Sequence, residues 1–163
     1  MVSFSVLDEF SLSLHGSMPP MGLMLKSHTG CTITVGDIGT VYAKSSKQKI
    51  TTKSSTEAEL VAVSDSANQG FFVRNFIAAQ GHVIGALVIY QDNMSCMSLL
   101  AAGRSNNERT RHVAIRYFWI TERVDNGEAR VLHKDGKDLF ANVLTKPLQN
   151  PQFEDETRGL TNW

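Results

Sequence analysis

The chain has no excess of charge of either sign, since its 163 residues hold 16 basic and 16 acidic side chains. A neutral total excludes a global attraction to nucleic acid or to an anionic membrane, so any polyanion site must be local. Cysteine is also scarce. Cys31 and Cys96 lie far apart and form no C-x-x-C pair or Cys/His cluster. Their placement argues against a zinc finger and predicts reduced thiols without a disulfide.

Long apolar runs and a basic N-terminal segment are missing as well. The apolar stretch at 18–25 is too short to span a membrane and contains Pro19-Pro20, and residues 1–25 hold no lysine or arginine. We therefore expect an intracellular protein, cytoplasmic or nuclear, without a signal peptide or membrane span. A hydrophobic content of 42% is enough for the core of one domain.

Hydrophobic spacing predicts a mixed-sheet α/β domain. Strands are expected where polar and apolar residues alternate or where a short apolar run occurs, at 10–15, 31–35, 40–43, 86–90 and 128–133. Helices are expected where apolar residues recur at helical spacing, at 54–81, 94–102, 113–124 and 139–144. The tail from Gln149 to Trp163 is expected to be irregular.

Acidic residues occur at two predicted element ends. Glu57 and Glu59 open the long helix, where Ser54-x-x-Glu57 and Thr56-x-x-Glu59 both fit a capping box and only one register can be right. Asp92 follows the buried strand, at the edge of an α/β sheet where ligands collect, although an Asx turn or a helix N-cap with Asn93 explains it equally well. A single acid holds a divalent ion poorly, so these residues gain meaning only as a set.

Several segments together resemble the ribonuclease H domain of Ty1/copia-type retrotransposon Pol polyproteins. They follow the order of that family and span roughly residues 26 to 148: Lys26-Ser-His-Thr-Gly30, Lys47-Gln-Lys49, Thr52-Lys-Ser-Ser-Thr-Glu-Ala-Glu-Leu60, Tyr90-Gln-Asp-Asn93, Arg109-Thr-Arg-His112 with Ile115-Arg-Tyr117, and Leu144-Thr-Lys-Pro-Leu148.

The resemblance implies an RNase H-like fold, which is a five-stranded mixed sheet flanked by helices. It also implies cleavage of the RNA strand of an RNA–DNA hybrid during reverse transcription, next to a reverse transcriptase domain of the same polyprotein. In that family, carboxylates hold two Mg²⁺ (or Mn²⁺) ions that activate water and stabilise the leaving oxygen. The helix-start glutamate of the family falls on Glu59, and its strand-end aspartate falls on Asp92.

Two of the four carboxylates that the resemblance implies are absent. Asn142 stands where the family has aspartate before Leu-Thr-Lys-Pro, and the first-strand aspartate falls by a loose spacing on Gly16. An amide oxygen can touch Mg²⁺ but brings no charge. Asp138 could serve as a substitute ligand if one helix face carries both it and Asn142. His133 could shuttle protons, or it could be an exposed residue at the end of a strand.

Contacts to nucleic acid are expected in two local basic stretches. One holds Lys44 with Lys47, Lys49 and Lys53 and no acid between 40 and 56; the other lies at 104–116. Such lysines and arginines can neutralise phosphates, and they can equally be solvated surface. The candidate contacts are Lys47, Lys49, Lys53, Asn93, Arg109, Arg111, His112 and Arg116.

The sequence therefore predicts a poorly matched segment at 1–25, an RNase H-like domain at 26–148 and a tail at 149–163. Its leading function is a ribonuclease H domain with a degraded metal site, weakened or inactive as a hydrolase. Two alternatives remain open: a binding module for hybrids or other nucleic acid that has lost the chemistry, and a retrotransposon fragment without a function.

Overall fold

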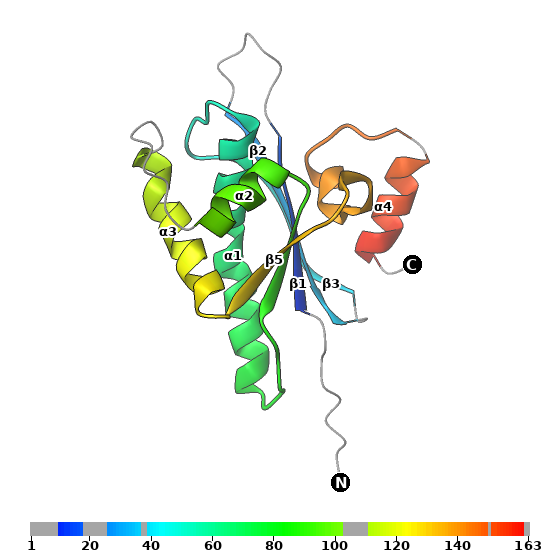
Figure 1. Ribbon diagram of the computed structural model, residues 1–163. Helices are drawn as coiled ribbons and strands as arrows, with labels where there is room; N and C mark the ends of the chain where they lie inside the picture. Colours follow the sequence, from blue (N-terminus) through cyan, green and yellow to red (C-terminus); the bar gives the residue numbers. More distant parts are fainter. Residues whose placement is uncertain (1–9, 18–25, 37–38, 103–110, 150, 162–163) are drawn as a thin grey trace.

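The computed structural model describes residues 10–17, 26–36, 39–102, 111–149 and 151–161, and at 10–17, 102, 111–117 and 159 it describes only the backbone. These residues form a five-stranded mixed sheet in the order β3-β2-β1-β4-β5 (Figure 1). The strands are β1 (Phe10–Ser17), β2 (His28–Val35), β3 (Thr40–Lys47), β4 (Leu87–Gln91) and β5 (Ala129–His133). The first three are antiparallel, and β4 and β5 run parallel to β1. The strand predicted at 10–15 thus lies at the centre of the sheet.

Helices cover both faces of this sheet (Figure 1). One face carries α1 (Ser55–Ala79), α2 (Met94–Ala102) and α3 (Arg111–Asp125), which pack against one another. The other face carries the 3₁₀ segment η4 (Phe140–Leu144), which packs on β1 and β2, and α4 (Gln152–Thr161), which packs on η4. The α/β prediction is confirmed.

The core lies between α1 and the sheet. Ile33 of β2 and Ile89 of β4 are fully buried and cluster with Val61 and Val63 of α1. All of Leu87–Ile89 is at most 5% exposed, which is the burial on both faces that its continuous apolar run predicts. On the outer side, the rings of Phe71 and Trp119 meet edge to face at 5.7 Å and join α1 to α3.

The start of α1 decides between the two capping registers. Ser54 is the N-cap, and its Oγ accepts a hydrogen bond from the backbone N–H of Glu57 at 3.1 Å. Glu57 in turn accepts one from the backbone N–H of Lys53 at 2.8 Å. Glu57 is therefore occupied with capping, and Glu59 is left for another role.

The predicted helix at 139–144 is different in the structure. The chain forms two 3₁₀ segments, η3 (Gly136–Asp138) and η4, and Leu139 between them is extended, with φ −93° and ψ 106°. Leu139 is fully buried, so this break places an apolar side chain in the interior. The prediction that one helix face carries both Asp138 and Asn142 is therefore wrong.

The prediction of an irregular tail at 149–163 is also wrong, because residues 152–161 form the helix α4. Local signals in its sequence favour the helix. Pro151 directly precedes it, Glu154 and Asp155 occupy the first turn, and Arg158 lies in the last, all placements that favour a helix. Glu156, only 3% exposed, accepts a hydrogen bond from Gln152 one turn earlier at 2.9 Å.

Candidate active site

Three of the predicted site residues lie around the end of β4. Glu59 lies in the second turn of α1, Asp92 directly follows β4, and Asn142 lies in η4. Because β4 and β5 are parallel, His133 at the end of β5 pairs with Gln91 at the end of β4 and reaches the same edge of the sheet. His133 is exposed there.

Gln91 connects two of these elements. Its side chain is fully buried, and its Nε2 donates to Oε2 of Glu59 at 3.3 Å. Its Oε1 accepts hydrogen bonds from the backbone N–H groups of Asp92 at 2.8 Å and Asn93 at 3.1 Å. Gln91 thus fixes both the Glu59 carboxylate, itself only 3% exposed, and the turn that carries Asp92. Sequence reasoning missed this residue, although a polar residue ending an apolar strand was a signal for it.

The capping role that competed for Asp92 belongs to its neighbour. Oδ1 of Asn93 accepts a hydrogen bond from the backbone N–H of Cys96 at 3.0 Å, so Asn93 caps α2. This bond engages only the Oδ1 atom of Asn93, so the expected contact of this side chain with nucleic acid stays a prediction.

The Asp92 carboxylate lies against Gly136. A Cβ added to Gly136 would stand 2.9 Å from Oδ2 of Asp92 and 3.9 Å from Nδ2 of Asn142. The Asp92 and Asn142 side chains therefore converge on one backbone position, and the absence of a side chain at Gly136 leaves room for both.

The pKa of the Cys96 thiol is affected by the carboxylates of this region. Burial and, after it, the negative charges of Glu59 and Asp92 raise the Cys96 pKa to about 12. Both carboxylates therefore act on one fully buried sulfur, which stays a neutral thiol at physiological pH. Cys31 and Cys96 are both free, as the sequence predicted.

Asn142 is 2% exposed, and within the described residues one of the two polar atoms of its side chain has a hydrogen-bond partner. Its Nδ2 donates to the carbonyl oxygen of Gly136, whereas its Oδ1 is buried and has no hydrogen-bond partner within the described residues. Carboxylate and amide oxygens are the ligands that Mg²⁺ accepts. Two carboxylates and one unpartnered amide oxygen fit a single divalent ion by donor type. Across the described ranges, no group of three or more His, Cys, Asp or Glu side chains could hold a metal.

The pairing of β1 with β2 and β4 determines which residue of β1 stands at the same height along the sheet as Asp92. Gly16 pairs with Thr29, whose Oγ1 accepts a hydrogen bond from Gln48 on the α1 face of the sheet. His15 pairs with Gly30, where an added Cβ would meet the Ala141 carbonyl oxygen at 2.6 Å. Position 15 is therefore on the η4 face, the face of Asn142. Ser13 pairs with Tyr90, so continuing that register by two residues brings position 15 level with Asp92.

The remaining predicted residues are exposed where the structure describes their side chains. Asp138 is exposed in its own 3₁₀ segment. Lys47 ends β3, and Lys49 and Lys53 lie in the connection to α1; all three are exposed. Arg109 lies outside the described residues, and the side chains of Arg111, His112 and Arg116 on α3 do as well.

Comparisons with known proteins identify the relatives of the chain. It is 31% identical over 129 residues to the retrovirus-related Pol polyprotein from transposon TNT 1-94 of Nicotiana tabacum, a match that covers 79% of this chain. It is 33% and 34% identical to the Pol polyproteins from transposons RE2 and RE1 of Arabidopsis thaliana, over 71% and 68% of this chain. The chain spans 8–10% of the length of these relatives. No family model matches it.

Solved structures show the same fold at low sequence identity. The N-terminal RNase H domain of a Mycobacterium tuberculosis protein superposes with a TM-score of 0.59 at 6% identity, covering 91% of this chain and 96% of that one. The RNase H1 of Halobacterium salinarum superposes with a TM-score of 0.58 at 13% identity, covering 90% and 98%. LC11-RNase H1, solved with an RNA/DNA hybrid, reaches 0.57 at 10% identity, covering 80% and 88%.

The chain belongs to the Ty1/copia-type Pol polyprotein family and has the RNase H-like fold, as its sequence motifs predicted. Among the described residues, no helix is both long and apolar enough to cross a membrane.

Proposed function

We propose that this chain is a ribonuclease H domain of a retroelement that cleaves the RNA strand of RNA–DNA hybrids slowly, because its metal site is incomplete. The observation that carries the proposal is the arrangement around Gln91. A buried amide fixes Glu59 and the Asp92 turn together, and Asn142 meets Asp92 across Gly136. In a longer polyprotein, a reverse transcriptase domain would supply the hybrid.

Each residue of this site would have a distinct role in the reaction. Glu59, Asp92 and the unpartnered Oδ1 of Asn142 would hold a Mg²⁺ or Mn²⁺ ion. When bound, such an ion supplies an activated water and charge stabilisation for the leaving oxygen. Gln91 keeps Glu59 in place, and Asn93 holds the start of α2 behind the Asp92 turn. His133, exposed at the same edge, would accept or donate a proton near the leaving group.

The missing charge explains why the reaction should be slow. A two-ion site needs carboxylates on both sides of its ions, which lie roughly 4 Å apart. Here position 142 supplies a neutral amide, and neither His15 nor Gly16 supplies a carboxylate. We therefore expect weak ion affinity, with one ion bound instead of two.

Substituting Asp92 tests this proposal. We expect the purified chain to cut the RNA of a hybrid slowly in Mg²⁺ or Mn²⁺, and Asp92→Asn to reduce that rate by more than the roughly 10–100-fold that outer-shell changes cost. The measurement is the initial rate on a labelled hybrid. Asp138→Asn is the matched control, since Asp138 is exposed and lies in a different 3₁₀ segment from Asn142, and it should retain the rate. Fast cleavage by the unmodified chain, abolished by Asp92→Asn, would contradict the incomplete site.

A second candidate function is binding of hybrids without cleavage. It is favoured by four exposed lysines, Lys44, Lys47, Lys49 and Lys53, which occur in a stretch without an acidic residue. If these side chains contact phosphates, binding should weaken linearly on a log–log plot against salt.

The Lys53→Ala variant tests whether these lysines contact phosphates or are only solvated surface residues. We expect the variant to bind a hybrid more weakly and to reduce the salt slope by about 1, because one phosphate contact is lost. Fluorescence anisotropy across a salt series measures both quantities. Lys146→Ala, which removes another exposed lysine, should leave the slope unchanged. Absence of hybrid binding at low salt would exclude the binding function.

A further inference from the structure

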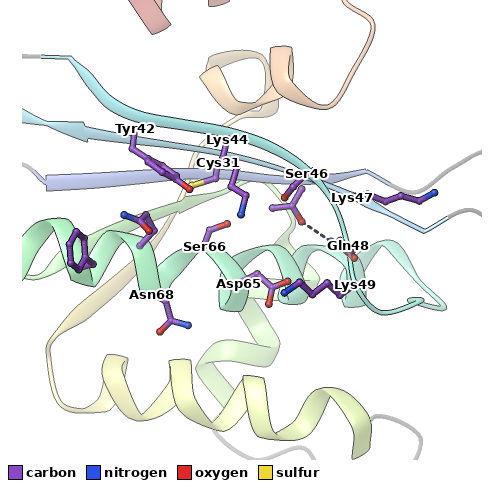
Figure 2. A pocket seen from close by; sticks show the side chains of 13 residues that line it. Cys31, Tyr42, Lys44, Ser46, Lys47, Gln48, Lys49, Asp65, Ser66 and Asn68 are labelled. Atoms are coloured by element: carbon purple, nitrogen blue, oxygen red, sulfur yellow. Dashed lines mark hydrogen bonds between the residues drawn. The ribbon is translucent and has the colours of Figure 1, made fainter.

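A groove lies between the edge strand β3 and α1, away from the carboxylate site. Its volume is about 400 Å³, within the range of ligand sites, and its lining comes from β2, β3, the following connection and the middle of α1 (Figure 2). The α1 residues that line it run from Asp65 to Phe72. They begin six residues after Glu59, which is roughly 9 Å along the helix at 1.5 Å per residue. The groove is therefore a separate place on the molecule.

The groove is locally basic in a neutral protein. Lys44, Lys47 and Lys49 line it, and Asp65 is the acidic residue among its lining residues. Figure 2 shows Lys44 extending from β3 toward Ser66 of α1, so its ammonium group lies inside the groove. Burial raises the pKa of the Cys31 thiol to about 11, although a hydrogen bond with Ser66 and, after it, the positive charge of Lys44 act to lower it. An anion entering the groove would meet this lysine.

Two aromatic rings accompany the lysines. Tyr42 of β3 and Phe72 of α1 both line the groove, and Phe72 is 65% exposed. The face of this ring is therefore accessible to a ligand in the groove. Rings beside lysines form the combination that binds unpaired nucleotides, in which the base stacks on the aromatic face and the phosphate meets the cation.

The side-chain oxygen of Gln48, in the wall of the groove, has no hydrogen-bond partner among the described residues. Gln48 is 3% exposed, and its Nε2 donates to Thr29 Oγ1 at 3.0 Å and to the Ala58 carbonyl oxygen at 2.8 Å. The carbonyl partner fixes the orientation of the amide, since it can only accept. The Oε1 atom of Gln48 then has no partner within the described residues. Because this atom is buried, it belongs to the polar inner wall of the groove and is not itself a contact for a ligand.

We propose that this groove binds a nucleotide of a single strand, with its phosphate at Lys44 and Lys49 and its base against Tyr42 and Phe72. A paired duplex does not offer a free base face to these rings, so the groove selects unpaired nucleic acid. The same chemistry could come from a free mononucleotide. This proposal does not depend on cleavage at the carboxylate site.

Binding of fluorescein-labelled oligothymidylate at low salt, followed by anisotropy, tests the groove. We expect saturable binding that Phe72→Ser weakens about tenfold and Lys44→Glu weakens at least as much. Phe76→Ser is the matched control, because Phe76 is also an exposed phenylalanine of α1, at 58%, but does not line the groove. Arg130→Glu makes the charge change of Lys44→Glu on β5. Both controls should bind like the unmodified chain.

Competition distinguishes the two sources of the nucleotide. If unlabelled adenosine monophosphate displaces the oligonucleotide at concentrations similar to those of unlabelled oligothymidylate, the ligand is a free mononucleotide and the single-strand proposal is overturned. Equal loss in the Phe72 and Phe76 variants, or no binding at low salt, would overturn it too. Phe72→Ser changes neither Glu59, Asp92 and Asn142 nor the exposed lysines, so hybrid cleavage by this variant, measured in parallel, reports on the carboxylate site alone.

Discussion

The paired substitution His15→Asp with Asn142→Asp is expected to raise the rate of RNA cleavage in a hybrid by at least about 100-fold in Mg²⁺. Changes to groups that only support metal ligands alter affinity or activity by roughly 10–100-fold, and direct ligands should exceed that. Position 15 lies on the face of Asn142 and level with Asp92, so the two new charges would complete a set of four carboxylates. The measurement is the initial rate over a Mg²⁺ series, in which the midpoint should also fall.

Gly16→Asp with Asn142→Asp is the matched control, because it adds the same two charges to the chain. Gly16 pairs with Thr29 and is on the α1 face, where Gln48 bonds to Thr29 and to the start of α1. A carboxylate there cannot reach Asp92 across the sheet. We expect no more gain than from Asn142→Asp alone. A larger gain from the position 16 pair than from the position 15 pair would refute the register on which the site rests.

Gln91→Leu is expected to lower the free energy of unfolding by about 3 kcal/mol. The substitution removes a hydrogen bond from a buried carboxylate and leaves two backbone N–H groups in the turn without their acceptor. Unpaired buried polar groups cost roughly 1–3 kcal/mol each, and charged groups cost more. Denaturant unfolding followed by circular dichroism measures the change. Gln80→Leu, at the exposed end of α1, should stay within about 0.5 kcal/mol of the unmodified chain.

A second substitution shows whether the Glu59 charge accounts for part of that cost. Gln91→Leu combined with Glu59→Leu removes the charge together with its partner, so the double variant should lose less stability than the two single variants summed. If the losses are additive, Gln91 acts on the turn alone and does not support Glu59.

Sequence patterns placed Glu59 near the start of a helix and Asp92 at the end of a strand because such element ends depend on local rules, whereas the choice of Glu59 over Glu57 came from the family resemblance. The capping box sets where α1 begins, and Glu59 then follows at a fixed distance along the helix. The apolar run of β4 ends where Asp92 begins, and the parallel strands bring that end to the same edge as His133. Both rules involve neighbours within a few residues, which a single sequence displays.

The parts that sequence could not supply depend on distant neighbours. The residue of β1 that is level with Asp92 is set by pairing with β2 and β4, and a spacing counted along the chain missed it by one position, which moves a residue to the other face of a sheet. The role of Gln91 requires Glu59, 32 residues away. The extended Leu139 is explained by its burial, and α4 by its end charges and its packing on η4.

Gly30 has a consequence for motion. The η4 backbone approaches so closely there that an added Cβ would meet Ala141 and Thr145 within 2.7 Å, and η4 reaches the sheet through β1 and β2. Asn142 is thus held by docking across a sequence separation of more than 100 residues, whereas Glu59 lies in α1 and Asp92 follows the buried strand β4. Units that dock on few neighbours open more readily than a core does. Amides of η4 and α4 should therefore exchange with solvent before those of β4, and a bound ion would slow the exchange of η4.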